Sequence, residues 1–525
     1  MVSSVKALLE LAPLKKVMYS SDGYAFPETF YLGASKAREV VYTVLRDACF
    51  HGDLTIVEAV EAAEDILFRN AMKFYKMNMD TEAYACRDDA VKAAVISSFV
   101  RVLWVDASGQ HRCRVVPAKR FDHVVCKHGV GLTMACMGMS SARDAPAPGA
   151  YLTATGEIRL MPDLTTYRKI PWMKNEDMVM ADMHVKPGVE WEYCPRAALR
   201  KMTKLLDDEF DLSLNAGFEN EFVIFKISSR EGKEELTPFN STPYCSTAGF
   251  DLIAPFLYEI CQSLHSLGIE VEQLHKEAGV GQYEIAIAHK PCILAADDVV
   301  YAREAIRATA RKHGMLASFL PKHDLKDVGS GSHVHLSLWR DGKNVFMAAD
   351  EGSPHGMSPT GEHFMAGILH HLPALLAFTA PTPNSYDRMK PNTWSGAYQC
   401  WGRENREAPL RTACPPGIGD GFVSNFEIKS FDASANPFLG LAAVLAAGID
   451  GLRRQLLLPE PVDVVDEKLA RLPQSLSEAV EALEDDGLFA DLIGDKLLVA
   501  VKAIRKEDIK QADQPGLLDS LIHRF

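Results

Sequence analysis

The sequence predicts an α+β fold, in which helices and strands both contribute but do not alternate in a fixed order. Strand-like and helix-like stretches follow one another without the rhythm of a parallel βαβ protein, and no segment repeats at a fixed period. Hydrophobic residues make up 47% and charged residues 24% of the chain, which is typical of a globular protein. The length of 525 residues predicts two or three domains, at roughly 100–200 residues per domain.

The first segment, residues 1–78, is predicted to contain one short strand and two helices. Residues 16–22 are rich in β-forming types, and residues 36–51 have the periodicity of a helix. Thr55 and Glu58 have capping-box spacing at the start of the second helix. Because these elements make a poor independent core, we expect them to pack on the rest of the chain or to be the remainder of a larger domain.

The second segment, residues 90–188, is predicted to be a small sheet domain. Its short β-rich runs are separated by turn-forming and loop-forming residues. The predicted strands are residues 98–105, 112–116 and 157–160, with a hairpin turn at 106–109 and a loop at 134–150.

The third segment, residues 189–525, mixes longer helices with strands. Asn436 and Pro437 form a strong helix start, with Asn as N-cap and Pro at the first helical position. Gly268 and Gly314 each follow the end of a predicted helix. The predicted helices are residues 196–208, 250–267, 296–313 and 439–457, and the predicted strands are residues 217–226, 331–339 and 426–431.

The net charge and the cysteine pattern indicate which partners and which cellular compartment to expect. The 56 basic and 70 acidic residues give a formal charge of −14 without a basic block, so neither nucleic acid nor a membrane is an expected partner. The 11 cysteines are scattered and form no CxxC pair, which favours a reducing compartment over disulfides or structural zinc. No apolar run reaches the ~18 residues of a membrane span. Lys6 and Glu10 interrupt the apolar start, so we expect no signal peptide and a cytoplasmic location.

Two pairs of glutamates stand out in the third segment. Glu219 and Glu221 lie two apart on a predicted strand, which aims both at one face. Glu277 and Glu284 flank a glycine-containing loop that lets both converge. Taken alone, Glu219 and Glu221 are better explained by a solvated strand face, and the pair of Glu277 and Glu284 is also a weak signal.

Histidines and basic residues follow. His333 and His335 share a strand face after a Gly-Ser-Gly loop, although an isolated HxH is more often structural. Glu427 and Lys429 are again two apart on a predicted strand. A set of arginines, each of which alone could form an ordinary surface ion pair, comprises Arg388, Arg403, Arg406 and Arg411.

Taken together, these residues indicate chemistry on a phosphate. Carboxylates and imidazole with little sulfur suit Mg²⁺ or Mn²⁺. Such ions and cationic side chains are what phosphoryl transfer from ATP requires. The chain has no G-x-x-x-x-G-K-[ST] loop, so phosphate binding must use another arrangement.

The order of these motifs resembles the glutamine synthetase family over about residues 90–525. The matching stretches are GFENEF, EAGVGQYEI, PKHDLKDVGSGSHVHLSL, NSYDR, ENREAPLR and FEIKSFDASANPFLGLAAVLAAGIDGL. The resemblance implies a β-grasp N-terminal domain at residues 90–188. It also implies a catalytic domain of curved antiparallel strands with helices at residues 189–525, and a double-ring homo-oligomer with active sites between subunits.

The same resemblance implies roles for individual residues. One metal ion would be held by Glu221, Glu277 and Glu284, and the other by Glu219, His333 and Glu427. Gly329 would belong to the loop over the amino-acid substrate, whose carboxylate Arg388 would hold. The residues near the phosphates of ATP and the developing charge would be His335, Ser337, Arg406 and Arg411, with Lys429 as a further cation of the catalytic set.

The chain departs from the ammonia-using members of that family at four places. Val328 replaces an Asn, and Trp394 replaces a Glu that closes over the ammonium site. Lys429 replaces an Arg, which keeps the charge but loses the two-pronged grip on a carboxylate. Residues 132–141 contain no clear counterpart of the loop that supplies an ammonium-binding Asp. The ATP and metal residues are therefore intact, whereas those for ammonia are not.

The first segment has its own resemblance, to the end of an amidohydrolase-type barrel. Such a barrel is fused to a glutamine synthetase part in the FluG and nodulin/glutamine-synthetase-like proteins of fungi and plants. Asp22 would match the last metal-ligating Asp of that barrel, but the upstream strands and their histidines are absent from this sequence. We therefore expect a structural remnant and disfavour a hydrolase.

The sequence predicts an ATP-dependent carbon–nitrogen ligase with Mg²⁺ or Mn²⁺ as cofactor. It would activate glutamate or a related acid as an acyl phosphate and join it to ammonia or another amine. The alternative is a noncatalytic glutamine-synthetase-like ring scaffold that keeps nucleotide and metal binding.

Overall fold

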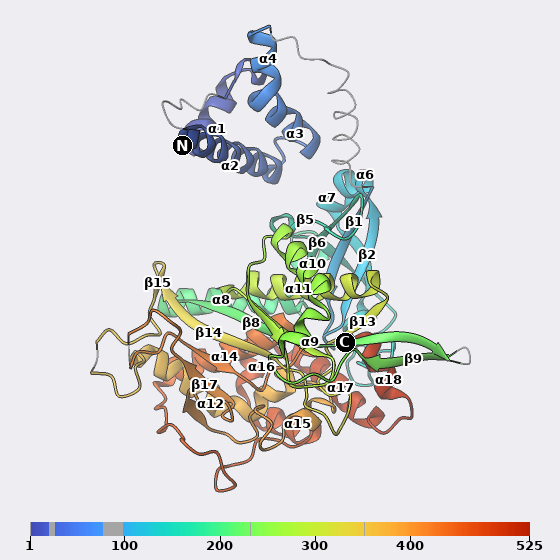
Figure 1. Ribbon diagram of the computed structural model, residues 1–525, viewed down its shortest axis with the longest axis vertical. Helices are drawn as coiled ribbons and strands as arrows, with labels where there is room; N and C mark the ends of the chain where they lie inside the picture. The colour runs from blue at the N-terminus through green and yellow to red at the C-terminus, as the bar shows by residue number, and fades with distance from the viewer. Residues whose placement is uncertain (1, 20–26, 77–97, 231–232, 351, 420) are drawn as a thin grey trace. The chain divides into compact units, whose positions relative to one another are not determined.

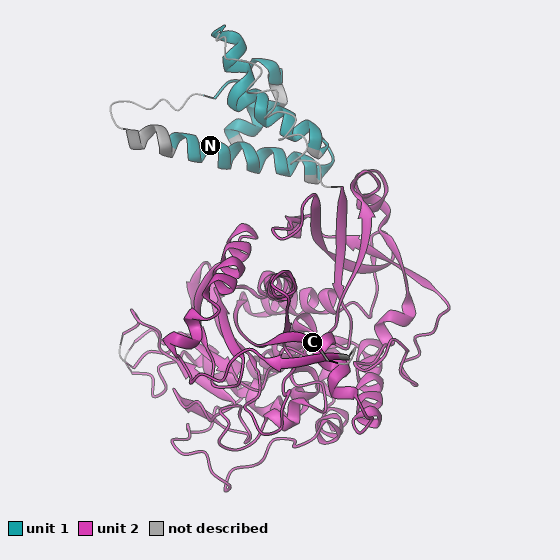
Figure 2. Cartoon of the chain, turned by 45° about the vertical axis from the view of Figure 1, so that its right-hand side comes forward, with its two compact units in different colours: residues 1–96 teal, residues 97–525 magenta. Residues whose placement is uncertain are grey.

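The computed structural model describes residues 2–19, 27–76, 98–230, 233–350, 352–419 and 421–525. The chain forms two compact units, residues 1–96 and 97–525 (Figure 2). A division of the second unit between residues 188 and 189 stays a prediction. None of the helices in the described ranges combines the length and the apolar character needed to cross a bilayer.

The described part of the first unit is helical. Val41, Leu45, Ala62 and Ile66 form its small apolar core. Thr55 caps the third helix through the predicted capping box with Glu58, so that prediction is confirmed. The helices are α1 (Val2–Leu11), α2 (Pro27–His51), α3 (Ile56–Glu64) and α4 (Asn70–Phe74), with a 3-10 turn at Leu14–Lys16 and a π-helical turn at Asp65–Arg69.

The strand predicted at residues 16–22 is wrong over its described part. Lys16 ends the 3-10 turn, and the next three residues are irregular. A single backbone hydrogen bond, from the N–H of Tyr19 to the carbonyl of Ile66, joins this stretch to a helical segment. A strand needs a partner strand for its backbone groups, and the described residues of this unit provide only helices. Residues 20–22, including Asp22, lie outside the described residues.

The second unit begins with a seven-stranded sheet. Its order is β2-β1-β6-β4-β3, with β5 and β7 also paired to β6. The predicted hairpin is present, because β1 and β2 pair antiparallel from Phe99–Pro117 to Val105–His111. The strands are β1 (Phe99–Val105), β2 (His111–Pro117), β3 (Val130–Thr133), β4 (Glu157–Pro162), β5 (Arg168–Lys169), β6 (Glu176–Lys186) and β7 (Val189–Glu190). Short helical segments between them are α6 (Ala118–Arg120), α7 (Cys126–His128), a π-helical turn at Phe121–Val125 and 3-10 turns at Met134–Gly138 and Leu164–Thr166.

An eleven-stranded sheet follows, with the order β10-β11-β8-β14-β18-β17-β16 and with β9, β12 and β13 also paired to β8 and β15 to β14. Figure 1 labels β8, β14 and β17 of this sheet. Its pairs are antiparallel except β16 with β17, and β8 is the longest strand. The strands are β8 (Ser213–Arg230), β9 (Lys233–Pro238), β10 (Val271–Lys276), β11 (Gln282–Ile287), β12 (Lys290–Pro291), β13 (Met315–Ser318), β14 (Ser332–Arg340), β15 (Lys343–Asn344), β16 (Trp401–Arg403), β17 (Leu410–Ala413) and β18 (Asn425–Ile428).

Helices pack on this sheet and on one another, which confirms the predicted α+β class. Asn436 caps α14 as predicted by accepting from the N–H of Leu439. The helix predicted at residues 250–267 is instead two helices, because Ile253 leaves the helical conformation and Pro255 starts the second one. The helices are α8 (Pro195–Phe210), α9 (Thr247–Asp251), α10 (Ala254–Ser266), α11 (Cys292–Lys312), α12 (Pro359–Thr379), α13 (Ser385–Arg388), α14 (Pro437–Arg454), α15 (Leu476–Asp485), α16 (Leu488–Ile493), α17 (Asp495–Gln511) and α18 (Leu517–Arg524).

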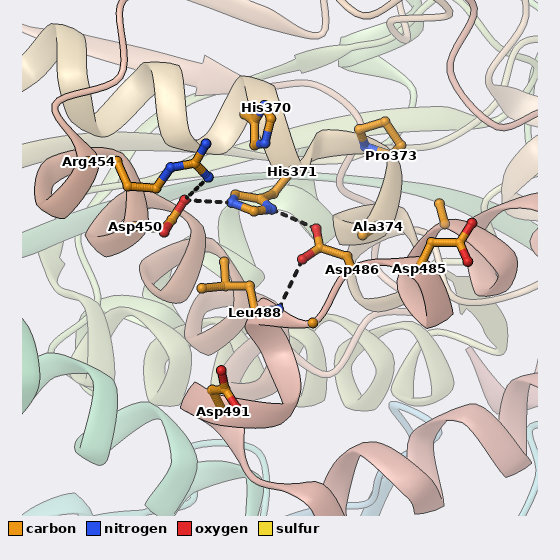
Figure 3. Close-up of a pocket in the computed structure, with 12 residues that line it drawn as sticks. His370, His371, Pro373, Ala374, Asp450, Arg454, Asp485, Asp486, Leu488 and Asp491 are labelled. Atoms are coloured by element: carbon orange, nitrogen blue, oxygen red, sulfur yellow. Dashed lines mark hydrogen bonds and ion pairs between the residues drawn. The ribbon is translucent and has the colours of Figure 1, made fainter.

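An acidic pocket of about 580 Å³ lies where α12, α14, α15 and α16 meet (Figure 3). Buried His371 of α12 is held between two carboxylates, 2.9 Å from Asp450 Oδ2 and 2.6 Å from Asp486 Oδ2. Arg454 also bonds Asp450. Burial alone would lower the pKa of His371, but the two carboxylates outweigh it and raise that pKa. His371 therefore links α12 to α14 and to the α15–α16 turn.

Replacing His371 with glutamine should destabilise the protein most in mildly acidic solution. A histidine whose pKa is raised by folding contributes its stability below its unfolded value of about 6.5 and loses it as the pH rises through the folded pKa. The pKa of Asp486 is lowered, since the bond from His371 outweighs burial, so its contribution is lost only at lower pH. We expect a loss of about 2 kcal/mol at pH 5.5.

Thermal unfolding of both proteins from pH 5.5 to 9 measures this effect. The difference between wild type and His371→Gln should shrink as the pH rises. The control is His370→Gln, because His370 is exposed and contacts His371 only through an edge-on ring contact. A difference that stays constant over this pH range would contradict the charged state of His371.

Candidate metal and nucleotide site

Neighbouring strands of the larger sheet bring acidic and histidine side chains to one place. Residues that face each other on antiparallel strands project from the same side of a sheet. The register therefore decides which of the predicted side chains meet. The facing pairs are Glu221 with Glu284, Glu219 with His333, and His335 with Glu427.

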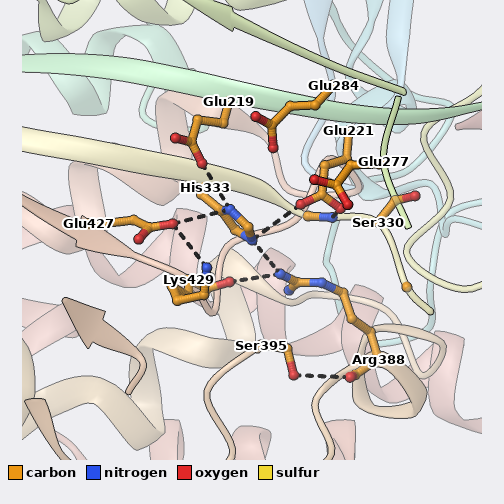
Figure 4. A network of polar contacts seen from close by, with 12 residues as sticks. Glu219, Glu221, Glu277, Glu284, Ser330, His333, Arg388, Ser395, Glu427 and Lys429 are labelled. Carbon is orange, nitrogen blue, oxygen red and sulfur yellow. Dashed lines mark hydrogen bonds and ion pairs between the residues drawn. The ribbon is translucent and has the colours of Figure 1, made fainter. Parts of the chain in front are cut away.

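His333 lies at the centre of the cluster (Figure 4). Its Nδ1 is 3.1 Å from both Glu219 Oε2 and Glu427 Oε1. Its Nε2 is 3.6 Å from Glu221 Oε1 and 2.9 Å from an Nη of Arg388. The structure thus brings together Glu219, His333 and Glu427, the group that the resemblance implies for one metal ion. Their ligand atoms lie within 4.8 Å of one another.

The second group is arranged around Glu284. Its carboxylate forms one set with the Glu221 carboxylate and the His333 imidazole, and a second set with His275 and Glu277. In each set the ligand atoms lie within 4.8 Å of one another, so Glu284 is the residue that Glu221 and Glu277 have in common. His275 Nε2 is 2.9 Å from Glu277 Oε1 and His275 Nδ1 is 3.8 Å from Glu284 Oε1. The sequence analysis missed His275. Its spacing of two from Glu277 was the available signal, but its position opposite Glu284 depends on the pairing of β10 with β11.

The carboxylates of the cluster differ in their proton affinity. Burial would raise the pKa of Glu219, but hydrogen bonds with His333 and His335 outweigh it and lower that pKa. Burial would also raise the pKa of Glu427, but Lys429 and both histidines lower it to about 2. The pKa of Glu284 is raised well above its usual value by burial and by the negative charges of four neighbouring glutamates. An additional positive charge beside Glu284 would relieve this repulsion.

Cations line the other side of the cluster. Arg411 Nε donates to Glu427 Oε2 at 2.5 Å, and Lys429 Nζ is 3.1 Å from Glu427 Oε1. Arg388 is only 4% exposed, and one Nη donates to the Lys429 carbonyl. The other Nη of Arg388 is buried without a hydrogen-bond partner, so it remains able to bind an anion.

Gly329 is required by the close approach of the Arg388 side chain. A Cβ at Gly329 would lie 2.5 Å from Arg388 Cγ and 2.7 Å from the Pro321 carbonyl oxygen. A Cβ at Gly331 would be equally close to His333 Nε2. These contacts explain why the loop before β14 carries glycines.

The remaining predicted residues lie further from the centre. His335 contacts Glu219 and Asn425 at 3.2 and 2.8 Å, and Ser337 Oγ accepts from the Trp339 indole. Arg406 is exposed and forms no ion pair with the described carboxylates. Burial, Cys245 and Glu277 raise the pKa of the Tyr244 phenol, and the positive charge of Arg406 opposes this rise. Arg403, by contrast, bonds the Pro354 carbonyl and is not part of the cluster.

Arg303 of α11 supports the cluster from within the core, and the sequence analysis did not identify it. Its guanidinium is fully buried and donates to Ser332 Oγ at 2.8 Å and to Asn220 Oδ1 at 3.4 Å. Ser332 precedes His333, and Asn220 lies between Glu219 and Glu221. Arg303 therefore fastens together the two strands that carry most of the cluster.

The donor set fits two hard divalent cations. Carboxylate oxygens with imidazole nitrogen suit Mg²⁺ or Mn²⁺, and the donor sets are built from these two ligand types alone. The groups meet at Glu284 and His333, which each belong to two of the three sets. Two ions could thus share one cluster.

Two of the positions that depart from ammonia-using members, Val328 and Trp394, are partly exposed, whereas Lys429 is not. Val328 is 37% exposed in the loop before β14, and Trp394 is 57% exposed. Trp394 has a φ of +55°, which is uncommon for a residue with a side chain. Lys429 is buried against Glu427.

Comparison with known proteins agrees with this geometry. Residues 192–515 match the family described as glutamine synthetase, catalytic domain. The whole chain is 31% identical to the protein FluG of Emericella nidulans and spans 61% of that protein's length. A γ-glutamylpolyamine synthetase, GlnA3 of Streptomyces coelicolor, is 33% identical over 77% of this chain and 88% of its own length.

Solved structures support the same relationship. A novel glutamine synthase homologue has a TM-score of 0.71 and 29% identity, covering 81% of this chain and 97% of its own. A GmaS/ADP complex has a TM-score of 0.70 and 27% identity, covering 81% of this chain and 96% of its own. Glutamine synthetases use ATP and divalent metal ions. The family match at residues 192–515 covers more than half of the chain and shows that the chain belongs to the glutamine synthetase family.

Proposed function

We propose that the protein is an ATP-dependent carbon–nitrogen ligase that activates glutamate, or a related acid, as an acyl phosphate and joins it to an amine. The observation that carries this proposal is the convergence of His333 and four glutamates from one sheet with Glu277 from the loop after β10, with buried cations beside them. A decayed scaffold would have no reason to keep such a costly arrangement of buried charge.

The metal-holding residues would be Glu221, Glu277 and Glu284 for one ion and Glu219, His333 and Glu427 for the other, with His275 beside the first group. Bound Mg²⁺ or Mn²⁺ would neutralise phosphate oxygens and so favour transfer of the γ-phosphoryl group.

The other residues would bind and orient the substrates. The unpartnered Nη of Arg388 would hold the substrate carboxylate beneath the loop of Gly329, and Lys429 would add a second positive charge. The phosphates and the developing negative charge would be met by His335, Ser337, Arg406 and Arg411. Like many members of the family, the chain would form a ring, here a double-ring homo-oligomer with active sites between subunits.

A larger amine than ammonia is the nucleophile that we favour. Trp394 and Val328 occupy the positions where ammonia-using members have Glu and Asn, and neither side chain can bind ammonium through a charge. The similarity to a γ-glutamylpolyamine synthetase supports the same choice.

Release of ADP from ATP with glutamate, Mn²⁺ and a panel of amines tests the proposal. We expect glutamate-dependent ADP release with at least one alkylamine and little with ammonia. Absence of ADP with every amine, although ATP binds, would favour the noncatalytic ring scaffold. The altered residues at positions 328, 394 and 429 are the observations in favour of that alternative.

Substituting Trp394 with Glu should increase the use of ammonia. The new carboxylate would attract ammonium and help to hold the nucleophile, so the rate with ammonia should rise by about tenfold while the rate with a bulky amine falls. The measurement is ADP release with each nucleophile at fixed glutamate. The control is Trp394→Gln, because glutamine has the size of glutamate but carries no charge. No gain with ammonia in Trp394→Glu would show that this position does not face the nucleophile.

A further inference from the structure

The Glu407 carboxylate lies at the edge of the active site without a cationic partner. It is half-buried, and its Oε1 accepts from the backbone N–H of Trp394 at 3.2 Å. Within the described ranges, no lysine, arginine or histidine forms an ion pair with it, and this includes the adjoining Arg406. An ionised carboxylate that is held by one N–H retains lone pairs for a further donor.

The loop that carries Glu407 is fixed at several points. Asn405 accepts from the N–H of Glu407 at 3.1 Å, and the Asn405 amide donates to the Val462 carbonyl at 3.0 Å. The carbonyl of Pro409 accepts from the N–H of Lys429 at 2.9 Å. Since Lys429 pairs with Glu427, Glu407 is attached by a short, ordered stretch of backbone to the centre of the cluster.

The loop that carries Trp394 is tied to Arg388. The hydroxyls of Thr393 and Ser395, on either side of Trp394, both donate to the Arg388 carbonyl at 3.1 Å. These bonds hold Trp394 in its left-handed backbone conformation, which leaves the indole 57% exposed. The backbone of Trp394 therefore joins the Glu407 carboxylate to the main chain of Arg388, the residue that would hold the acid substrate, and Trp394 itself is exposed next to that carboxylate.

We propose that Glu407 and Trp394 bind the distal ammonium group of a diamine or polyamine acceptor. The carboxylate supplies an ion pair and the indole supplies a π-face, which together recognise an alkylammonium. One neutral amino group of the acceptor forms a C–N bond with the acyl carbon, the acyl C–O bond breaks with release of inorganic phosphate, and the nitrogen loses a proton. The second, protonated amino group rests on this pair. This inference rests on the proposed function and names the class of amine that the ligase prefers.

The test compares 1,4-diaminobutane with butylamine, which has the same carbon chain but no second ammonium. In Glu407→Gln the amide oxygen can still accept from Trp394, so the loop is retained while the charge is lost. We expect the KM for 1,4-diaminobutane to rise about tenfold and the KM for butylamine to change less than twofold. The matched control is Glu404→Gln in the same loop, whose carboxylate accepts from the N–H of Cys414 instead and which should change neither value.

Equal changes in KM for the two amines in Glu407→Gln, or no change in KM for either amine, would overturn the inference. Calorimetric titration of the wild type and Glu407→Gln with 1,4-diaminobutane separates this result from failure of the proposed function. If the wild type releases no ADP but binds the diamine about tenfold more tightly than the variant does, the ligase proposal fails and the binding pair stands. If both proteins bind the diamine equally, the pair is refuted whatever the turnover.

Discussion

Glu284→Gln is expected to abolish metal-dependent ADP formation while the protein stays folded. Glu284 belongs to two of the three sets of ligand atoms and is the residue that joins Glu221 with Glu277, so its loss weakens the ion position proposed for these three glutamates. We expect the rate to fall by at least about 100-fold. Because Glu284 is buried among like charges, a neutral amide of the same shape should not destabilise the metal-free protein.

Thermal unfolding with and without Mn²⁺ distinguishes a loss of metal binding from a loss of folding stability. Wild type should unfold at a higher temperature in Mn²⁺, because a ligand that binds only the folded state stabilises it. Glu284→Gln should lose most of that increase and keep the metal-free value. Glu272→Gln, an exposed carboxylate next to the same acidic region, serves as the control. An unchanged response to Mn²⁺ in Glu284→Gln would remove this residue from the metal site.

Arg388→Lys is expected to cause the second largest loss. The guanidinium uses one Nη to bond both His333 and the Lys429 carbonyl, and it keeps the other free in a buried place. A lysine cannot keep these bonds and also present a planar pair of donors to a carboxylate. We expect kcat/KM for glutamate to fall by about 100-fold, mainly through KM, while ATP still binds.

Initial rates at varied glutamate and a separate nucleotide titration measure these effects. The control is Arg403→Lys, since Arg403 donates to a backbone carbonyl away from the cluster. Loss of ATP binding in Arg388→Lys, or an unchanged KM for glutamate, would contradict the role proposed for Arg388.

The sequence predicted the strand residues of the site well because side chains two apart on a strand share a face. Glu219 with Glu221 and His333 with His335 follow that rule. The rule does not tell which strands are neighbours. His275 faces Glu284 only through the register of β10 on β11, and Arg303 reaches Asn220 and Ser332 only through the packing of α11. Both residues were therefore missed.

Local signals also explain where the fold was misread. Pro255 could have divided the helix predicted at residues 250–267, since proline interrupts a helix interior. The β-rich composition of residues 16–19 did not produce a strand, because strand formation depends on a partner as well as on residue type. The cap at Asn436 depends only on neighbouring residues, and it was predicted correctly.

The order of the charged groups along the chain has a consequence for synthesis on the ribosome. Glu219, Glu221, Glu277 and Glu284 are all translated before Arg388 and Lys429. The interval from Glu284 to Arg388 lasts roughly 5–20 s at usual elongation rates. Until then the nascent acidic strands must stay hydrated, because their carboxylates cannot be enclosed without the later cations. The acidic cluster is consequently among the last parts of the newborn polypeptide to close.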